Sequence, residues 1–264
     1  VYTPTSGVTR TVRFSLVEGV SLYGGFAGSE TVREERDWEA RFTVLSGDVD
    51  GDDAADAQGV VASTAAVTGA NAFHVVSAEG VTNDAVLDGF IVTGGRAEGE
   101  GEDGNGGGIY MVDGSPTLRH LVVEGNCAGV CETSARERLF LRQGDGARSV
   151  GSAWATAATG QGGGIYVLRG SPVLTDVVVR RNDAAVGGGM KIAGAGSPGL
   201  KGVTFTENTA VAGGGLHGGG GTPTLSDVSF LRNVATFGGG MYNGGSVASL
   251  KNVAFTQNVG TSTF

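Results

Sequence analysis

Short apolar and polar runs alternate through the second half of this chain, and the alternation recurs with a fixed period. Each unit has three glycines and an apolar residue, a turn, a Leu-x-x-Val-x-Phe pattern, and an Asn three residues after the Phe position. The third glycines of the five units are Gly108, Gly164, Gly189, Gly215 and Gly240, so the steps between units are 56, 25, 26 and 25 residues. A period of this size predicts a solenoid, with one insertion of about 31 residues in the first step.

The pattern within each unit predicts strands rather than helices. Residues two apart on a strand face the same side, so positions such as Val203 and Phe205 form columns that face one interior. Glycine costs about 1 kcal/mol at each helical position, and the chain has 50 glycines in 264 residues, which excludes a helical solenoid. We therefore predict an all-β fold, a single-stranded parallel β-helix with coils of about 25 residues.

Two further columns follow from this alignment. An outward column is expected at Tyr110, Tyr166, Lys191, His217 and Tyr242, where rings stack between coils or stack on sugars. Stacked Asn side chains can pass hydrogen bonds from each amide to the next, which predicts a structural ladder along the helix. The ladder residues are Asn126, Asn182, Asn208, Asn233 and Asn258.

We expect one β-helix domain over residues 1–264, as a fragment of a longer chain. Residues 1–95 form decorated N-terminal coils, with strands at 12–16 and 20–26 and a short helical lid at 29–41 that begins with a capping-box spacing at Thr31 and Glu34. Residues 96–264 form the regular coils and carry a long loop insertion at 128–161. Trp38 is expected to fold back from the lid onto the coils.

The charge balance excludes several partners. Eighteen Lys and Arg against 27 Asp and Glu give a net charge of −9, so nucleic acid and anionic lipid, which are held mainly by basic clusters, are not expected to bind. No apolar run approaches the roughly 18 residues of a membrane span, so direct membrane insertion by this segment is not expected. The chain opens on no signal peptide, so for an exported protein the signal and the anchor lie outside this chain.

The repeats resemble a known family. The glycine triplets, together with Phe-Thr-Glu-Asn at 205–208 and Phe-Leu-Arg-Asn at 230–233, are similar to the Gly-Gly-Ala-Ile and Phe-x-x-Asn repeats of chlamydial polymorphic outer membrane proteins. The first half, with Leu-Tyr-Gly-Gly-Phe-Ala-Gly at 22–28 and Leu-Ser-Gly-Asp at 45–48, resembles the opening of large bacterial surface proteins with right-handed parallel β-helix repeats. The resemblance implies a right-handed helix, a location outside the cell or on the bacterial outer membrane, and no particular reaction.

An acidic turn is the candidate metal site. Asp48, Asp50, Asp52 and Asp53 surround Gly51, and several hard oxygens near one another suit Ca²⁺. The spacing differs from that of an EF-hand, since the glycine comes too early and no Glu closes the loop. Calcium binding and a solvated acidic turn both remain open, and calcium is the one cofactor that the sequence suggests.

Other candidates lie in the insertion and on the outer face. Arg136, Arg138, Arg142 and Arg148 make the insertion a basic excursion from an acidic body, and loops on a rigid solenoid commonly carry recognition. Cys127 and Cys131 form either a local disulfide or two free thiols. Asp176 and Asp227 share one column two coils apart, about the upper limit for a pair of inverting glycosidase carboxylates, although a mixture of turn residues fills the rest of that column.

The leading functional expectation is a non-enzymatic extracellular or cell-surface protein, a stalk or adhesin-like passenger that binds host, neighbouring-cell or polysaccharide ligands through the 128–161 loop. The first alternative is a carbohydrate-binding or polysaccharide-degrading β-helix. The second is a fibre subunit that associates end to end through unpaired strands.

Overall fold

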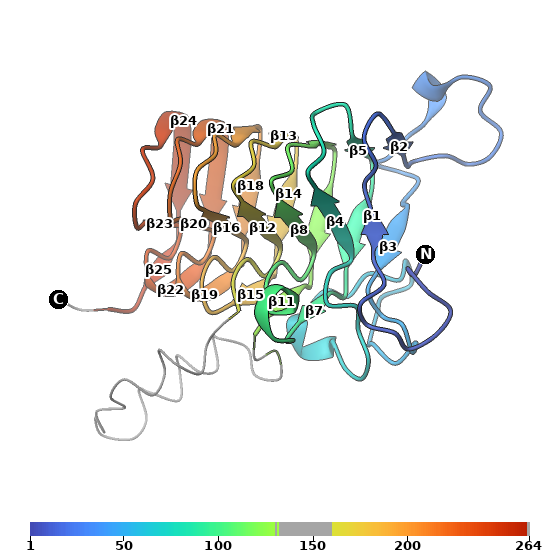
Figure 1. Cartoon of the computed structure of the whole chain (residues 1–264), viewed down its shortest axis with the longest axis horizontal. Coiled ribbons are helices and arrows are strands. Elements are labelled where there is room, and N and C mark those ends of the chain that lie inside the picture. Colours follow the sequence, from blue (N-terminus) through green and yellow to red (C-terminus); the bar gives the residue numbers. More distant parts are fainter. Residues whose placement is uncertain (130, 132–159, 263–264) are drawn as a thin grey trace.

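The computed structural model describes residues 1–129, 131 and 160–262, and these form a stack of coils with the two chain ends at opposite ends of the stack (Figure 1). Strands in this part of the chain pair in parallel and make three sheets, of seven, twelve and six strands. The expected parallel β-helix is confirmed. The helical content of the described residues is three short 3₁₀ turns, η1 (Arg33–Glu35), η2 (Thr64–Ala66) and η3 (Gly101–Gly104).

The strands of the three sheets are as follows. The seven-stranded sheet contains β1 (Phe14–Ser15), β4 (Val76–Glu79), β8 (Ile109–Val112), β12 (Ile165–Leu168), β16 (Met190–Ala193), β20 (Leu216–Gly218) and β23 (Met241–Asn243). The twelve-stranded sheet contains β2 (Ser21–Tyr23), β5 (Val86–Asp88), β9 (Thr117–Arg119), β13 (Val173–Thr175), β17 (Gly199–Lys201), β21 (Thr224–Leu231), β24 (Ser249–Thr256), β3 (Val44–Ser46), β6 (Ile91–Thr93), β10 (Val122–Glu124), β14 (Val178–Arg180) and β18 (Thr204–Thr206). The six-stranded sheet contains β7 (Arg96–Ala97), β11 (Cys127–Ala128), β15 (Asp183–Ala184), β19 (Thr209–Ala212), β22 (Val234–Phe237) and β25 (Val259–Gly260).

One coil visits the sheets in a fixed order. The chain passes through a strand of the seven-stranded sheet, two strands of the twelve-stranded sheet, and a strand of the six-stranded sheet, as in β8, β9, β10 and β11. In the last two coils the two middle strands merge into the eight-residue strands β21 and β24. Like residues pair with like, for example Leu174 with Leu200. The register therefore follows the columns expected from the repeat.

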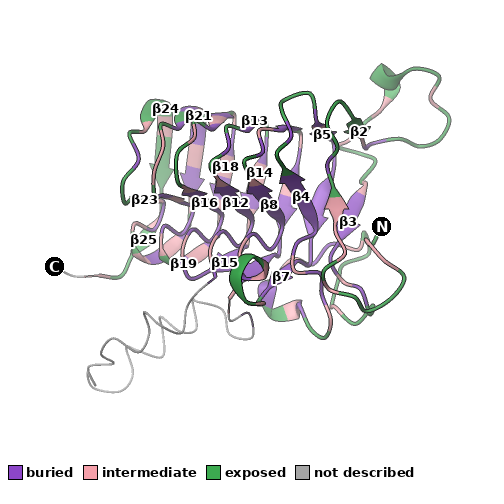
Figure 2. Cartoon of the chain, viewed as in Figure 1, coloured by how far each residue is buried: buried purple, intermediate pink, exposed green. Residues whose placement is uncertain are grey.

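The interior is filled by these columns. Phe205 and Phe230 are fully buried and stack with their ring centroids 5.0 Å apart, and Phe255 continues the stack 4.8 Å further on. Figure 2 shows the buried strand positions running through the middle of the stack. Phe255 and Leu250, in the same columns on β24, are half exposed because no later coil covers them in the described part of the chain.

The Asn column forms a hydrogen-bonded ladder at the corner that follows the twelve-stranded sheet. In the first four ladder residues, Asn126 to Asn233, the side-chain Nδ2 donates to the Oδ1 of the Asn one coil further on, at 2.9–3.1 Å, and the backbone N–H donates to the same oxygen. The second Nδ2 proton goes to a backbone carbonyl of the preceding coil, as from Asn208 to Val179. The neighbouring glycine triplets leave room for these side chains, since a Cβ on Gly189 would lie 3.1 Å from the Asn208 side chain.

Two excursions decorate the N-terminal coils. The first leaves the coil between β2 and β3, and it is anchored by Arg36, whose guanidinium lies 2.9 Å from the buried Asp88 carboxylate, and by Trp38, which stacks on His120 at 4.2 Å. The expected helix at 29–41 is wrong beyond the single turn η1. The turn ends at Arg36, whose backbone is extended (φ −62°, ψ 147°) and whose guanidinium is held against the coil by Asp88.

The outward column lies on the opposite side of its strands from the core, but its first members are not exposed. Tyr110 is 2% exposed and stacks on His74 and Tyr166, while Lys191 is 7% exposed. Lys191 Nζ lies 2.7 Å from His217 Nδ1, and burial lowers the pKa of Lys191 to about 8. The column is therefore a packing ladder at Tyr110, Tyr166 and Lys191, and its aromatic rings there do not form an open sugar platform.

Candidate functional site

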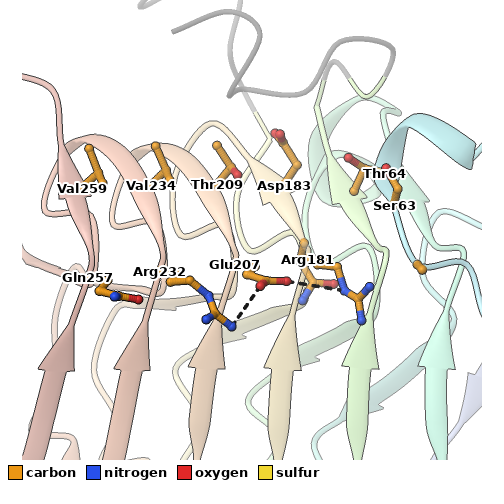
Figure 3. A pocket seen from close by; sticks show the side chains of 12 residues that line it. Ser63, Thr64, Arg181, Asp183, Glu207, Thr209, Arg232, Val234, Gln257 and Val259 are labelled. Atoms are coloured by element: carbon orange, nitrogen blue, oxygen red, sulfur yellow. Dashed lines mark ion pairs between the residues drawn. The ribbon is translucent and has the colours of Figure 1, made fainter. Parts of the chain in front are cut away.

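A groove runs along the corner between the twelve-stranded and six-stranded sheets, beside the Asn ladder. It has a volume of about 540 Å³ and crosses four successive coils (Figure 3). The two positions that flank each ladder Asn form it. The preceding positions are Arg181, Glu207, Arg232 and Gln257, and the following positions are Asp183, Thr209, Val234 and Val259.

The side chains on the floor of the groove come from left-handed backbone positions. Arg181, Glu207, Arg232 and Gln257 have φ values of 53°, 57°, 52° and 54°. A left-handed conformation costs a residue with a Cβ about 1 kcal/mol or more, and Gly, Asn and Asp adopt it most readily. The corner turns in the same way in each coil, so the long polar side chains project into the groove in a row.

The charges on the floor alternate and are paired. Glu124, which is buried, lies 2.6 Å from Arg180 and 2.7 Å from Arg181. Glu207 lies between two arginines, 3.2 Å from the guanidinium of Arg232 and 3.9 Å from Nε of Arg181. Nε of Arg181 is buried and has no hydrogen-bond partner among the described residues. The floor therefore offers donors and acceptors in turn, with one donor left unsatisfied.

One end of the groove is closed by the second excursion, which leaves the coil after β3. Ser63 and Thr64 line that end, and Thr93 Oγ1 on β6 accepts a hydrogen bond from the backbone N–H of Val61 at 3.0 Å. Gly125 occupies the position equivalent to Arg181 in the preceding coil, and an added Cβ there would collide with the carbonyl oxygen of Val61. The excursion thus covers the corner in the earlier coils and leaves it open from Arg181 onwards.

Sequence reasoning did not identify this groove. Its floor residues occupy the variable position just before each Asn of the Phe-x-x-Asn pattern, for which the sequence suggested no role. The available signal was Arg, Glu, Arg and Gln in one column of a chain that is otherwise rich in glycine at its turns. The column becomes a candidate site only when the left-handed φ is known.

The acidic turn is arranged around Gly69. Carboxylate oxygens of Asp48, Asp50 and Asp52 lie within 4.8 Å of one another, and a Cβ on Gly69 would lie 2.6 Å from Asp50 Oδ2. Most of these oxygens already accept hydrogen bonds, for example from the backbone N–H groups of Gly51 and Ala70. The arrangement fits a solvated turn, and the three oxygens also suit a hard cation.

Asp53 lies apart from those three carboxylates. It accepts hydrogen bonds from the Thr68 backbone N–H at 2.7 Å and from Asn71 Nδ2 at 2.7 Å. Burial raises its pKa to about 6, helped by the charges of Asp48 and Asp52. Asp53 therefore fastens the second excursion to the coils.

The other predicted residues have simpler surroundings. The four arginines of the insertion, Arg136, Arg138, Arg142 and Arg148, lie outside the described residues. Cys127 and Cys131 are joined in a disulfide. Asp176 and Asp227 both stand at left-handed turns, where Asp227 accepts a hydrogen bond from Asn252 at 2.7 Å and Asp176 reaches into the space above Gly202.

Comparison with known proteins adds no relative. The chain matches no protein-family model, no curated protein and no solved structure. Among the described residues, no helix has the length and apolar character needed to cross a membrane.

Proposed function

We propose that this chain is a non-enzymatic extracellular or cell-surface β-helix that binds an extended ligand along the corner groove. The observation that carries the proposal is the row of long polar side chains at left-handed positions. The groove would serve an adhesin-like role as a second binding surface, beside the 128–161 loop expected from the sequence.

The residue types found at left-handed positions support a binding role for the groove side chains over a purely structural one. Among the described residues, 21 glycines have positive φ, against ten residues of other types. Five of those ten are Asp, Asn or His, which tolerate this conformation. Four of the other five line the groove, and the fifth is Arg169. Backbone strain concentrated in one row indicates that the side chains are kept for a purpose other than stability.

The disulfide supports a location outside the cytoplasm, and the net charge bears on the possible partners. The Cys127–Cys131 disulfide is of the kind that persists in oxidising compartments. The net charge of −9 keeps a stacked β protein soluble and disfavours nucleic acid as a partner. Both agree with the surface proteins that the repeats resemble.

A matched pair of variants tests the proposal. Replacing Arg181, Glu207 and Arg232 together with Gly removes the polar row and relieves the left-handed strain, whereas Arg169→Gly relieves the same strain outside the groove. Binding of labelled protein is measured on immobilised polysaccharides, extracellular-matrix proteins and bacterial cell walls. We expect the triple variant to lose at least about tenfold in affinity and Arg169→Gly to bind like the parent.

The control variant is suited to the comparison because Arg169 is also a left-handed arginine in an ion pair, with Asp113 at 2.8 Å. Thermal unfolding of each variant shows whether it has folded. Equal binding by the parent and a folded triple variant on every surface would overturn the proposal.

A further inference from the structure

The groove also indicates the class of its ligand, an inference that rests on the proposed function. Four features of the described groove bear on the ligand class: the pairing of its charged side chains, the spacing of its polar groups, the hydrogen bonds that its backbone already makes, and its apolar wall.

The charge pairing disfavours a polyanion. Arg180 and Arg181 are paired with Glu124, and Arg232 is paired with Glu207. An anionic ligand would have to displace carboxylates that remain beside it, and the chain as a whole carries a charge of −9. A polycationic ligand would likewise have to displace guanidinium groups, those of Arg180, Arg181 and Arg232, that would remain beside it. A ligand without net charge meets neither obstacle.

The spacing favours a repeating ligand that both donates and accepts hydrogen bonds. Floor side chains recur once per coil, about 4.8 Å apart, and they alternate between guanidinium and carboxylate before ending at Gln257. The 3.9 Å between Arg181 Nε and Glu207 Oε2 is too long for a direct hydrogen bond. The Arg181 and Glu207 side chains are 37% and 42% exposed, so a ligand hydroxyl group can accept from an outer N–H of the Arg181 guanidinium and donate to the Glu207 carboxylate.

The backbone N–H groups of the floor are already paired and do not offer donors to a peptide strand. The N–H groups of Arg181, Glu207 and Arg232 already donate to carbonyl oxygens of the next coil, at 3.1, 3.1 and 3.0 Å. A peptide strand added here would find no free N–H group at these floor positions, so hydrogen-bond donors on the floor come from side chains. Beside the floor, the wall changes from Thr209 to Val234 and Val259, which can pack against C–H groups of a ligand.

We infer that the groove binds a linear, uncharged, polyhydroxylated chain, a neutral polysaccharide, lying along the axis of the β-helix. Its hydroxyl groups bridge the alternating guanidinium and carboxylate groups of Arg181, Glu207 and Arg232, and its C–H faces pack against Val234 and Val259. Because each coil contributes one floor side chain, the groove contacts several consecutive sugar units at once.

Calorimetric titration of the whole chain tests this ligand class. The probes are hexasaccharides of β-1,4-glucose, β-1,4-xylose, β-1,4-mannose and α-1,4-glucose, with hexagalacturonate as the charged counterpart, at low and at physiological salt. We expect at least one neutral probe to bind with an affinity that changes less than about twofold with salt, and hexagalacturonate to bind at least about tenfold more weakly. Glu207→Leu should weaken the neutral complex at least about tenfold, and Arg169→Gly should leave it unchanged.

The outcomes separate this inference from the proposed function. Failure of every neutral probe, or tighter and salt-dependent binding of hexagalacturonate, overturns the neutral-polysaccharide inference. The groove function survives either result if the triple glycine variant still loses surface binding. Binding of a neutral probe that Glu207→Leu does not weaken places the sugar elsewhere and also overturns the inference. Arg232→Gly, which relieves strain instead of adding an apolar side chain, repeats the test in case Glu207→Leu fails to fold.

Discussion

The corner between the twelve-stranded and six-stranded sheets is built differently in the two halves of the stack. In the early coils the left-handed position is Gly94 and then Gly125, and the second excursion lies over both. A Cβ on Gly94 would lie 3.0 Å from Asp53 Oδ2, and one on Gly125 would collide with the Val61 carbonyl oxygen. From Arg181 onwards nothing in the described chain covers the corner, and long polar residues replace glycine.

The difference shows two ways to stabilise the same turn. The covered coils gain from packing of the excursion, where Val60 joins Val44 and Ile91 in a small apolar cluster. The open coils lack this cover and rely on the stacked core and the Asn ladder. Glycine is required only where another segment packs on the corner, so the open coils can carry long polar residues there at some cost in backbone strain.

The Asn ladder should therefore contribute strongly to the folding stability of the open half. Asn208 is fully buried, donates to Val179 and Asn233, and accepts two hydrogen bonds from Asn182. Asn208→Ala leaves buried donors and acceptors without partners, and we expect it to lower the free energy of unfolding by about 3 to 5 kcal/mol. Urea denaturation measures the loss.

The control for Asn208 is Asn258→Ala at the last rung of the ladder. Asn258 is only partly buried, and water can satisfy the groups that its removal exposes. We expect a loss of about 1 kcal/mol there. Equal losses at the two positions would contradict the dependence of the open half on a buried ladder.

Exchanging the corner residues of the two halves tests the role of the cover. Gly125→Arg introduces a Cβ at the point where the Val61 carbonyl lies, so the excursion must move, and we expect a loss of about 3 kcal/mol. The reverse exchange in the open half, Arg232→Gly, removes strain together with an exposed ion pair, and should stay within about 1 kcal/mol of the parent. Thermal unfolding of both variants measures the asymmetry. A tolerated Gly125→Arg would show that the excursion does not close this corner.

The comparison also shows what the sequence could reveal. The parallel stack was predictable because identical positions in successive coils come to lie above one another, as Leu174 and Leu200 do. Like residues recurring at a fixed step are visible in the letters alone. The same reasoning placed the stacked Asn residues in one column, which the hydrogen bonds now describe in detail.

Features that depend on distant segments were not predictable. The burial of Tyr110 follows partly from stacking on His74, which precedes the regular repeats, so the outward column looked open in the sequence. The groove was hidden for a related reason: Gly125 and Arg181 share a column and a left-handed turn, and only the position of Val61 explains why they differ. Backbone φ and the course of an excursion are not encoded in a local pattern.

The smallest stability change that we expect is in the acidic turn of the covered half. Asp53 has a folded-state pKa of about 6, above the 3.8 of an unperturbed Asp, so its favourable contribution to stability is complete below about pH 4 and is lost as the pH rises through 6. Asp53→Asn, which stays neutral, should therefore gain in melting temperature relative to the parent between pH 4 and pH 7.

Bound Ca²⁺ would favour the ionised carboxylates of Asp48, Asp50 and Asp52, and millimolar calcium should stabilise the parent at pH 7 by about 1 kcal/mol. Thermal unfolding with calcium, with magnesium and with chelator measures both effects, and Asp176→Asn serves as a control carboxylate outside the turn. An unchanged parent curve in calcium would leave the turn as a solvated, hydrogen-bonded fastening of the excursion.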